Sequence, residues 1–274
     1  MPADAGRPFT AIILAAQRNG KLDPLAAEAG VTHKCLVTIV DRPLIEWVIE
    51  ALTPVPGLQR IRICIEPEAI AAVRAVRGAS GELGIPVDFV ASAPTITDSA
   101  YASAQGVDPP MILTTGDNVN LTPAAVERML GAVADGADVA VAMASRPAVL
   151  AAHPEGQRRF YEFSDEAYSN CNLYAIGSHA GLKMAETFRE GGQFAKNRAR
   201  LVSAFGWFNI LLFRFKLLSL AGAMKRLSAR FGLRIAAVVL EDGGHAVDVD
   251  NRRTYIIADI ILRERLARNG SLGH

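Results

Sequence analysis

The chain has 274 residues, of which 50% are apolar, and a formal net charge of +1. A chain of this length can bury a large core, and at about 150 residues per domain it predicts one large domain over residues 1–274 that carries an insertion. The near-zero net charge gives no strong positive field, so we expect no nucleic-acid partner.

The cysteines and the N-terminus favour a cytoplasmic protein. Cys35, Cys64 and Cys171 are odd in number and widely spaced, which is neither a disulfide framework nor a CxxC metal motif. The N-terminal residues lack the basic and apolar regions of a secretory signal. The most membrane-like stretch, 207–220, is interrupted by polar residues and is shorter than the roughly 20 residues that a spanning helix needs.

The first half of the chain alternates between predicted strands and helices. It opens at Phe9 with the apolar run FTAIILAA, which is typical of a strand buried on both faces of a parallel sheet. A polar loop over 17–30 follows, then a short strand candidate, CLVTIV, and a helix that begins at Pro43. Further strands are predicted at 60–65, 87–90, 111–114 and 138–144, and further helices at 68–77, near 99–105 and at 123–134.

This alternation predicts right-handed crossovers and an α/β fold, in which a mostly parallel sheet has helices on both faces. Past residue 150 the pattern is less regular. It predicts a strand at 172–176, a long helical stretch at about 181–231, a last strand at 234–240 and a C-terminal helix. The helical stretch is the expected insertion.

Ligands of open α/β sheets bind outside the carboxyl ends of the strands, so the loops that follow strands are the first candidates for a site. The loop LAAQRNGKL begins with the small residues Ala15 and Ala16, which let a ligand approach the backbone, and its Lys21 could reach a phosphate. Taken alone, the segment fits a plain surface loop with a solvated lysine better.

A second loop follows the strand predicted at 111–114. The segment ILTTGDNVNLTP delivers Asp117 at the tip of an apolar strand, where a carboxylate is well placed to hold Mg²⁺. The alternative for an aspartate before a helix is an N-cap. Thr122, directly before Pro123, is the better cap candidate, which leaves Asp117 free for a metal.

A third candidate lies near the C-terminus, in the segment AVDVDNRRTY. Asp248 and Asp250 are two residues apart, so their side chains would point the same way if the backbone were extended. One of them could complete a metal site begun by Asp117. By itself, such a pair is more often a turn with a helix cap than a pair of ligands.

These segments, in this order, resemble a known family. The LAA loop, the segment HKCLVTIVDRPLIEWVIEAL, the strand ending in TTGDNVNLTP and the motif VDVDN look like the NTP transferases of the molybdenum cofactor guanylyltransferase type, a branch of the sugar-phosphate nucleotidyltransferases. The resemblance covers about the first 145 residues well and the last 35 moderately. It implies a Rossmann-like sheet of the GT-A type.

The resemblance implies phosphate and metal ligands at four positions. Lys21 stands where the family has the basic residue of its first loop, and Lys34 matches a family lysine that would meet a phosphate oxygen. Asp117 and Asp250 match the two Mg²⁺ ligands.

The nucleotide and acceptor contacts are implied in the same way. The first loop of the family wraps the triphosphate, and the matching residues here are Leu14, Ala15, Ala16 and Gln17. Thr97 and Ser99 are candidate nucleotide contacts, although a helix start capped by Thr97 or Asp98 fits that segment at least as well. Asn172 matches a strand that faces the acceptor, and a buried asparagine bonded to the backbone is the alternative.

One departure from the family stands in the first loop, where Gln17 and Asn19 replace two glycines. Bulky side chains there could hinder the close backbone approach that glycine permits, and either change the nucleotide preference or weaken the enzyme. Activity is the favoured interpretation, because the matching lysines and aspartates all remain.

The resulting hypothesis is a Mg²⁺-dependent nucleotidyltransferase that moves a nucleoside monophosphate from an NTP, with CTP or UTP favoured, to a phosphorylated sugar, polyol or similar small molecule. The alternatives are a molybdopterin guanylyl- or cytidylyltransferase and a weakened, nucleotide-binding regulatory protein. The basic and apolar stretch 193–231 is expected to be a helical flap that packs on the sheet or on a second copy in a homodimer; the second possibility is a peripheral contact with an anionic membrane.

Overall fold

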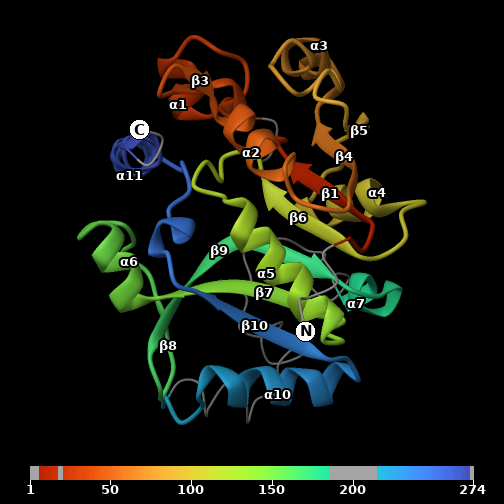
Figure 1. The fold of residues 1–274 in the computed structure, drawn as a ribbon, viewed down its shortest axis with the longest axis vertical. Helices are drawn as coiled ribbons and strands as arrows, with labels where there is room; N and C mark the ends of the chain where they lie inside the picture. The colour runs from red at the N-terminus through yellow and green to blue at the C-terminus, as the bar shows by residue number, and fades with distance from the viewer. Residues whose placement is uncertain (1–5, 18–20, 185–214, 272–274) are drawn as a thin grey trace.

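The computed structural model describes residues 6–17, 21–184 and 215–271. Its main sheet runs in the order β10-β7-β9-β6-β1-β4-β5, and β8 pairs with β9 off this path (Figure 1). The strands are β1 (Phe9–Leu14), β4 (Leu58–Ile65), β5 (Val87–Ala91), β6 (Met111–Thr115), β7 (Val139–Ser145), β8 (Tyr161–Glu162), β9 (Ala167–Ile176) and β10 (Ile235–Leu240).

The sheet is mostly parallel, as predicted. Strand β1 lies between β4 and β6 and is parallel to both, β5 extends the sheet beyond β4, and β10 is parallel to β7. The exception is β9, which is antiparallel to both β6 and β7. This reversed strand was not foreseen, and the strand predicted at 172–176 is only its second half.

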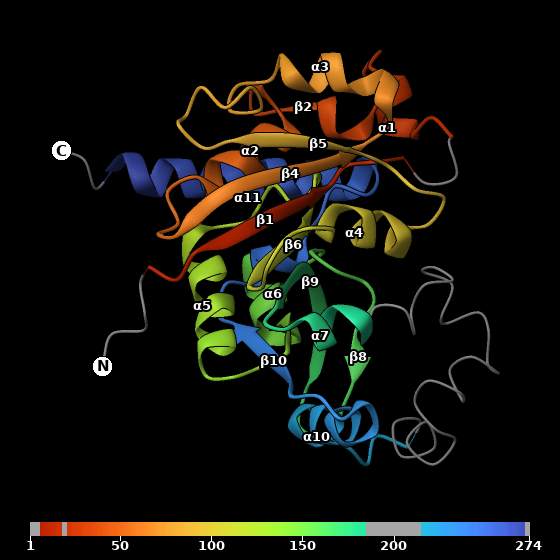
Figure 2. The same ribbon diagram turned by 90° about the vertical axis from the view of Figure 1, so that its right-hand side faces the viewer.

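Helices cover both faces of the sheet (Figure 2). They are α1 (Pro24–Glu28), α2 (Leu44–Leu52), α3 (Ile70–Arg74), α4 (Ile96–Ala104), α5 (Pro123–Ala134), α6 (Arg146–Ala152), α7 (His179–Met184), α10 (Leu220–Phe231) and α11 (Arg252–Ser271). The neighbouring β1 residues Ile12 and Ile13 are both fully buried but belong to different apolar clusters, one shared with α4 and the other with α2 and α5. The apolar run at Phe9 is therefore a strand buried on both faces, as predicted.

A third apolar cluster joins the two ends of the chain. It contains Leu25 of α1, Trp47 of α2, Val119 after β6, and Val247 and Val249 before α11. Figure 1 shows α11 beside α1, and the Tyr255 hydroxyl donates a 2.8 Å hydrogen bond to the Thr38 carbonyl. This packing brings the segment of Asp248 and Asp250 to the end of β6.

The segment CLVTIV is not one strand, which corrects the prediction. It begins in a single 3₁₀ turn, η2 (Lys34–Leu36), and continues into a small antiparallel hairpin of β2 (Thr38–Ile39) and β3 (Arg42–Pro43). Between these strands Val40 and Asp41 have φ of 45° and 62°, the pattern of a tight type I′ turn. Two consecutive residues with positive φ are easier to foresee when one is glycine, and neither is glycine here.

Other boundaries also differ from the predictions. The helix expected at 68–77 is a 3₁₀ turn, η3 (Pro67–Ala69), followed by the short α3, and α4 begins at Ile96 and not near 99. Helix α6 and strand β8 were not foreseen. By contrast, α5 has the expected bounds, and the Thr122 side chain caps it by accepting from the Ala125 backbone N–H at 3.3 Å.

The helical stretch expected at about 181–231 is interrupted within the part that the structure describes. Residues 215–219 are not helical, and α10 begins afresh with Ser219 as its N-cap, whose side chain accepts from the Gly222 backbone N–H. The Asp165 carboxylate accepts a 3.0 Å hydrogen bond from the first N–H of α10. The expected flap at 193–231 otherwise lies mostly outside the described residues.

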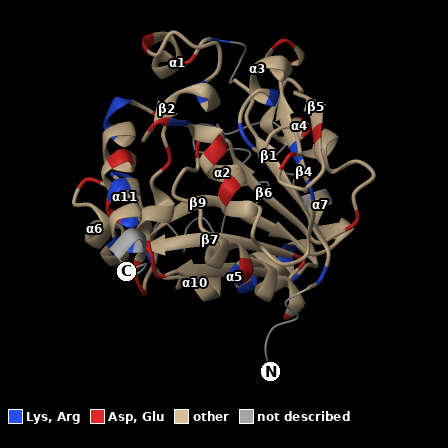
Figure 3. Cartoon of the chain, turned by 45° about the horizontal axis from the view of Figure 1, so that its top comes forward, with Lys and Arg blue, Asp and Glu red and all other residues tan. Residues whose placement is uncertain are grey.

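The described residues show charges of mixed sign and no membrane-spanning helix. Basic and acidic residues are interspersed along the ribbon (Figure 3), and their numbers almost balance, at a net charge of +1. Among the described residues no helix is both long and apolar enough to cross a membrane.

Candidate active site

Asp117 lies at the carboxyl end of β6, beside the end of β1. The Gly116 backbone N–H donates to the Leu14 carbonyl at 2.9 Å, which ties the two strand ends together. A Cβ atom added at Gly116 would lie 3.1 Å from Ala15 Cβ and 3.3 Å from Cys35 Cβ, so this turn is closely packed against both segments. The Asp117 residue is only 7% exposed.

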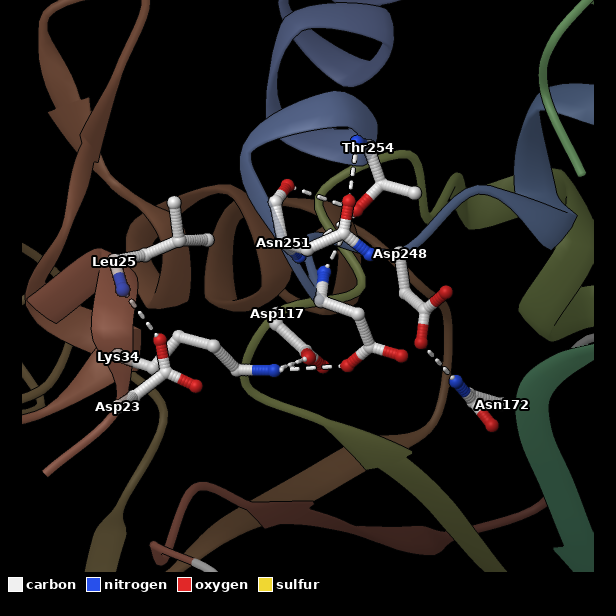
Figure 4. A network of polar contacts seen from close by, with 9 residues as sticks. Asp23, Leu25, Lys34, Asp117, Asn172, Asp248, Asn251 and Thr254 are labelled. Carbon is white, nitrogen blue, oxygen red and sulfur yellow. Dashed lines mark hydrogen bonds and ion pairs between the residues drawn. The ribbon is translucent and has the colours of Figure 1, made fainter. Parts of the chain in front are cut away.

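Lys34 reaches Asp117 from the 3₁₀ turn η2. Its Nζ donates to Asp117 Oδ2 and, at 3.1 Å, to Asp250 Oδ1; Figure 4 shows the lysine extended toward the aspartates. Burial lowers the pKa of Lys34, but Asp117 and Asp250 outweigh it and raise the pKa above its usual value. The lysine is therefore a permanent positive charge at the end of the sheet.

Asp248 and Asp250 follow the 3₁₀ turn η6 (Gly243–Ala246), and the buried Val249 separates them. The Val249 backbone N–H donates to the Asp117 carbonyl at 3.2 Å, which holds this extended segment against the end of β6. Helix α11 is capped by Asn251, whose Oδ1 accepts from the backbone N–H groups of Arg253 and Thr254. The cap of α11 is therefore Asn251 and not its neighbour Asp250.

The three aspartates Asp117, Asp248 and Asp250 form one cluster. Each offers a carboxylate oxygen, and these oxygens all lie within 4.8 Å of one another. Burial, together with the charges of the two other aspartates, raises the pKa of Asp248 to about 7. Three carboxylates and Lys34 leave a formal charge of −2 when all are ionised, and an oxygen-only donor set suits a hard divalent cation such as Mg²⁺.

Asn172 stands at a β-bulge that turns its side chain toward this cluster. The register of β7 and β9 shifts between Val141 and Met143, opposite Asn172, whose φ is 48°. Bulges re-aim side chains, and asparagine tolerates this left-handed conformation better than most residues. The Asn172 amide nitrogen donates a 2.7 Å hydrogen bond to Asp248 Oδ2, as Figure 4 shows, so a purely backbone-bonded asparagine is not what the structure contains.

The first loop begins at the end of β1. Leu14 and Ala16 are half-buried, and the Ala15 backbone N–H donates to the Cys64 carbonyl at 2.9 Å. Lys21 is exposed and, among the described residues, makes no ion pair, while Asn19 lies outside them. The structure thus brings together Lys34, the aspartates and Asn172, and it records no contact between Lys21 and this group.

Gln17 does not project freely into the loop. Its backbone N–H donates to Glu66 Oε1 at 2.9 Å, and its side-chain amide donates to the Thr32 carbonyl at 2.9 Å. Glu66 is a residue that the sequence analysis missed. Its signal was its place directly after the strand predicted at 60–65, the same signal that identified Asp117.

The start of α4 is capped by Thr95, whose Oγ1 accepts from the Asp98 backbone N–H at 3.0 Å. The expected caps, Thr97 and Asp98, are wrong, because both lie inside the first turn. Ser99 is 4% exposed, and its hydroxyl accepts a 2.9 Å hydrogen bond from the Ala93 backbone N–H. Thr97 is also buried, at 8% exposed. Both residues lie near the carboxyl end of β5, and the Ser99 hydroxyl holds the loop that precedes α4.

Solved structures with the same fold include transferases. A hypothetical transferase from Thermus thermophilus is 22% identical, with a TM-score of 0.71 over 91% of this chain and 99% of that chain. The 4-diphosphocytidyl-2C-methyl-D-erythritol synthase of Anaerococcus prevotii is 11% identical, with a TM-score of 0.59 over 94% and 99%. A CMP:2-keto-3-deoxy-manno-octonic acid synthetase complexed with CTP is 16% identical, with a TM-score of 0.58 over 94% and 99%.

Sequence comparison identifies the family directly. No curated protein sequence matches the chain. The family model for the MobA-like NTP transferase domain matches residues 11–180, which is more than half of the chain and includes the first loop, Lys34, Asp117 and Asn172. The family resemblance and the α/β fold inferred from the sequence are both confirmed. The chain belongs to the family of MobA-like NTP transferase domain proteins.

Proposed function

We propose that this protein is a Mg²⁺-dependent nucleotidyltransferase that transfers a nucleoside monophosphate from CTP or UTP to a phosphorylated sugar, polyol or similar small molecule and releases pyrophosphate. The observation that carries the proposal is the convergence of Lys34 with Asp117, Asp248 and Asp250 beside the end of β1. Ligands of open α/β sheets bind outside the carboxyl ends of the strands, which is where these residues lie, and the family match supports an NTP as the ligand.

The reaction needs charge neutralisation more than it needs covalent help from the protein. An oxygen of the acceptor phosphate attacks the α-phosphorus of the NTP, the bond from that phosphorus to the oxygen bridging to the β-phosphorus breaks, and pyrophosphate leaves with the electron pair. The attacking oxygen is already anionic, so no general base is required. Lys34 would reduce the repulsion between the two anions by its fixed positive charge.

Asp117, Asp248 and Asp250 would hold the metal ion. Their formal charge together with Lys34 is −2, which would balance one divalent cation. Bound Mg²⁺ would supply further neutralisation of phosphate charge and act as a template for the triphosphate. We propose Asp117 and Asp250 as its ligands from the sequence, and the contact geometry adds Asp248. Lys21 is proposed to reach the triphosphate from the first loop.

The remaining contacts follow the arrangement of the strand ends. The nucleotide is proposed to lie over the ends of β1, β4 and β5, where Leu14, Ala15, Ala16, Gln17, Thr97 and Ser99 are found. The acceptor is proposed to approach from the side of Asn172. CTP as a candidate substrate is supported by two of the compared structures, one of a diphosphocytidyl compound synthase and one of a CMP-sugar-acid synthetase complexed with CTP. UTP is proposed from the sequence resemblance alone. A cytoplasmic location stays part of the proposal.

Pyrophosphate release tests the function directly. Purified protein with Mg²⁺ is incubated with each of the four NTPs and a panel of sugar phosphates, polyol phosphates and molybdopterin, with the Asp117→Asn variant as the background control. The expected result is release that requires both an acceptor and CTP or UTP. Release with molybdopterin as the acceptor would favour the molybdopterin transferase instead, and nucleotide binding without release on any acceptor would favour a regulatory protein.

A further inference from the structure

A closed set of polar contacts lies at the base of the first loop. Gln17 lies in the first loop, Thr32 and His33 lie between α1 and η2, and Glu66 directly follows β4. The Gln17 amide donates to the Thr32 carbonyl at 2.9 Å, and the Gln17 backbone N–H donates to Glu66 Oε1 at 2.9 Å. The other carboxylate oxygen, Glu66 Oε2, lies 3.2 Å from His33 Nε2, and His33 Nδ1 lies 3.0 Å from Thr32 Oγ1.

The contacts of Glu66 with Gln17 and of His33 with Thr32 are partly buried, whereas the contact of the Gln17 side chain with Thr32 lies at the surface. Buried polar groups are costly unless they are paired. His33 is 3% exposed and the Glu66 side chain 17% exposed. The carboxylate of Glu66 can therefore not turn to water without breaking its contacts with Gln17 and His33. Glu66, which directly follows β4, thus contacts both Gln17 in the first loop and His33, the residue before Lys34.

The His33 end of this set leads directly to Lys34. His33 is the N-cap residue of η2, and its carbonyl accepts the Leu36 backbone N–H at 3.0 Å. The position of the His33 side chain therefore bears on the start of the turn that carries Lys34. On its other side Lys34 is held by Asp117 and Asp250, so the lysine lies between this set of contacts and the aspartate cluster.

We propose that Gln17, His33 and Glu66 are positioning residues for nucleotide binding, and we call these three the loop clasp. The inference rests on the proposed function, since the loop clasp would hold the first loop and Lys34 in position to bind an NTP. In this arrangement Gln17 does not obstruct the loop as a misplaced side chain. Its side chain ties the start of the first loop to the segment that follows α1. Because its backbone N–H donates to Glu66, the phosphates take their donors from elsewhere, including Lys21 and Lys34.

The proposal reverses the expectation for one substitution. If the Gln17 side chain only obstructed the nucleotide, Gln17→Gly would improve NTP binding, because it frees the backbone for close approach. A glutamine in the clasp would be harmed by it, because the contact to Thr32 is lost and the loop end gains conformational freedom. Gln17→Gly is therefore expected to raise the KM for the NTP, with a much smaller change in kcat.

The experiment compares Glu66→Ala, Glu66→Gln and Gln17→Gly with the wild type. Ser228→Ala is the matched control, since the Ser228 hydroxyl accepts a 2.9 Å hydrogen bond from the Ile235 backbone N–H and ties α10 to β10 away from the loop. Two quantities are measured: hydrogen exchange of the backbone amide of residue 17 without nucleotide, and KM for the NTP separately from kcat. The free energy of unfolding is recorded for each variant.

Glu66→Ala is expected to speed exchange at Gln17 and to raise the KM about tenfold, as for loss of a hydrogen bond to a charged group. Glu66→Gln, which keeps an acceptor for the Gln17 N–H, is expected to fall between Glu66→Ala and the wild type, and Ser228→Ala is expected to change neither quantity. Unchanged exchange at Gln17 in both Glu66→Ala and Gln17→Gly would overturn the clasp even if the enzyme is active. If the wild type releases no pyrophosphate with any NTP, the proposed function fails, and the exchange data together with KD values for NTP binding replace KM as the test of the clasp. If Glu66→Ala does not fold, Glu66→Gln and Gln17→Gly give the same decision.

Discussion

The two sides of the aspartate cluster are built in different ways. Asp117 lies two residues after the end of β6, and the turn that carries it is held by the backbone hydrogen bond from Gly116 to Leu14 of β1 and by close packing of Gly116. Asp248 and Asp250 lie outside regular structure, and Asp248 is oriented by a side chain, Asn172, at a bulge in an antiparallel strand. The first side is fixed by the sheet, whereas the second side is an extended segment held by one backbone hydrogen bond, from Val249 to Asp117, and by side-chain contacts. Substitutions on the first side should therefore remove function, and those on the second side should adjust it.

The largest effect is expected from Asp117→Asn. The change keeps the size of the side chain but removes the charge that Lys34 contacts and that a metal ion would need. We expect the rate of pyrophosphate release to fall at least a hundredfold, which corresponds to about 3 kcal/mol. Far-UV circular dichroism should be unchanged, because the residue lies in the turn after β6 and is not part of an apolar cluster.

The same substitution on the second side provides the control. Asp248→Asn and Asp250→Asn are each expected to raise the Mg²⁺ concentration needed for half-maximal activity by about tenfold. Both should keep measurable turnover at high Mg²⁺, because two carboxylates of the cluster remain. A rate for Asp117→Asn above about a tenth of wild type, or a complete loss in Asp248→Asn alone, would contradict the contrast between the two sides.

The second largest effect concerns the two lysines. Lys34→Ala and Lys21→Ala are each expected to cost about 2–4 kcal/mol in kcat/KM, as for removal of one preorganised donor. They should differ in their response to arginine. Lys21 is exposed, so Lys21→Arg should keep most activity, whereas Lys34 is confined between two aspartates, so the larger, planar guanidinium of Lys34→Arg should fit poorly. Equal activity of Lys21→Ala and wild type would remove Lys21 from the site.

A pH effect on stability is expected on the second side. Burial, and to a smaller extent Arg265, lower the pKa of His245 to about 4, although Asp242 acts in the opposite direction. Above pH 6.5 the histidine is neutral in both the folded and the unfolded chain. Below that, the unfolded chain binds the proton first, so the free energy of unfolding falls as the pH drops toward 4. Between pH 7 and pH 5 the loss should be about 2 kcal/mol.

His245→Gln isolates that contribution, because other groups also titrate in the acid range. The variant removes the titrating ring and keeps a polar group near Thr122, which lies 3.3 Å from His245 Nε2. Urea unfolding at the two pH values should show a smaller decrease in the variant than in the wild type. An equal decrease would mean that the histidine binds a proton in the folded chain as readily as in the unfolded one.

The smallest effect should appear at Asn172, where two substitutions are compared. Both Asn172→Gly and Asn172→Ala remove the hydrogen bond to Asp248. Only alanine also meets the cost of a left-handed backbone, since φ at this position is 48°. Asn172→Ala should therefore be less stable than Asn172→Gly by about 1 kcal/mol in thermal or urea unfolding. Mg²⁺ dependence should change equally in both variants, and a more stable alanine variant would rule out the strained bulge.

The sequence was most informative where a strand is buried on both faces. The runs at Phe9 and at Met111 are continuous and apolar, and each ends abruptly in small or polar residues, so both the strand and the loop after it were predictable. Helix α5 was equally clear, because Thr122 and Pro123 mark its start. The strand ending in Asp117 was therefore foreseen, and its place beside the end of β1 followed from the α/β alternation.

The second side was less predictable for physical reasons. Strand β9 alternates buried and half-buried residues over Ala167–Ile176, and its first half carries Tyr, Ser and Asn, so neither apolar content nor a continuous run identified it. The bulge at Asn172 depends on pairing with β7, a contact between distant segments that no local pattern encodes. The pair Asp248 and Asp250 was found, but the contact of Asp248 with Asn172 was not. The clasp residue Glu66 was overlooked, although it occupies a strand end of the kind that was searched.

Gly116 has a consequence for how related chains can diverge. A side chain at this position would press on Ala15 and on Cys35, which belong to two other segments of the chain. The three positions therefore share one small volume, and a substitution in one changes which residues the others accept. Across relatives of this protein, a larger residue at the position of Gly116 should occur only together with a smaller or displaced neighbour at the position of Cys35, since Ala15 has little left to give. Sequence changes in the first loop, in η2 and in the turn after β6 should for this reason be correlated and not independent.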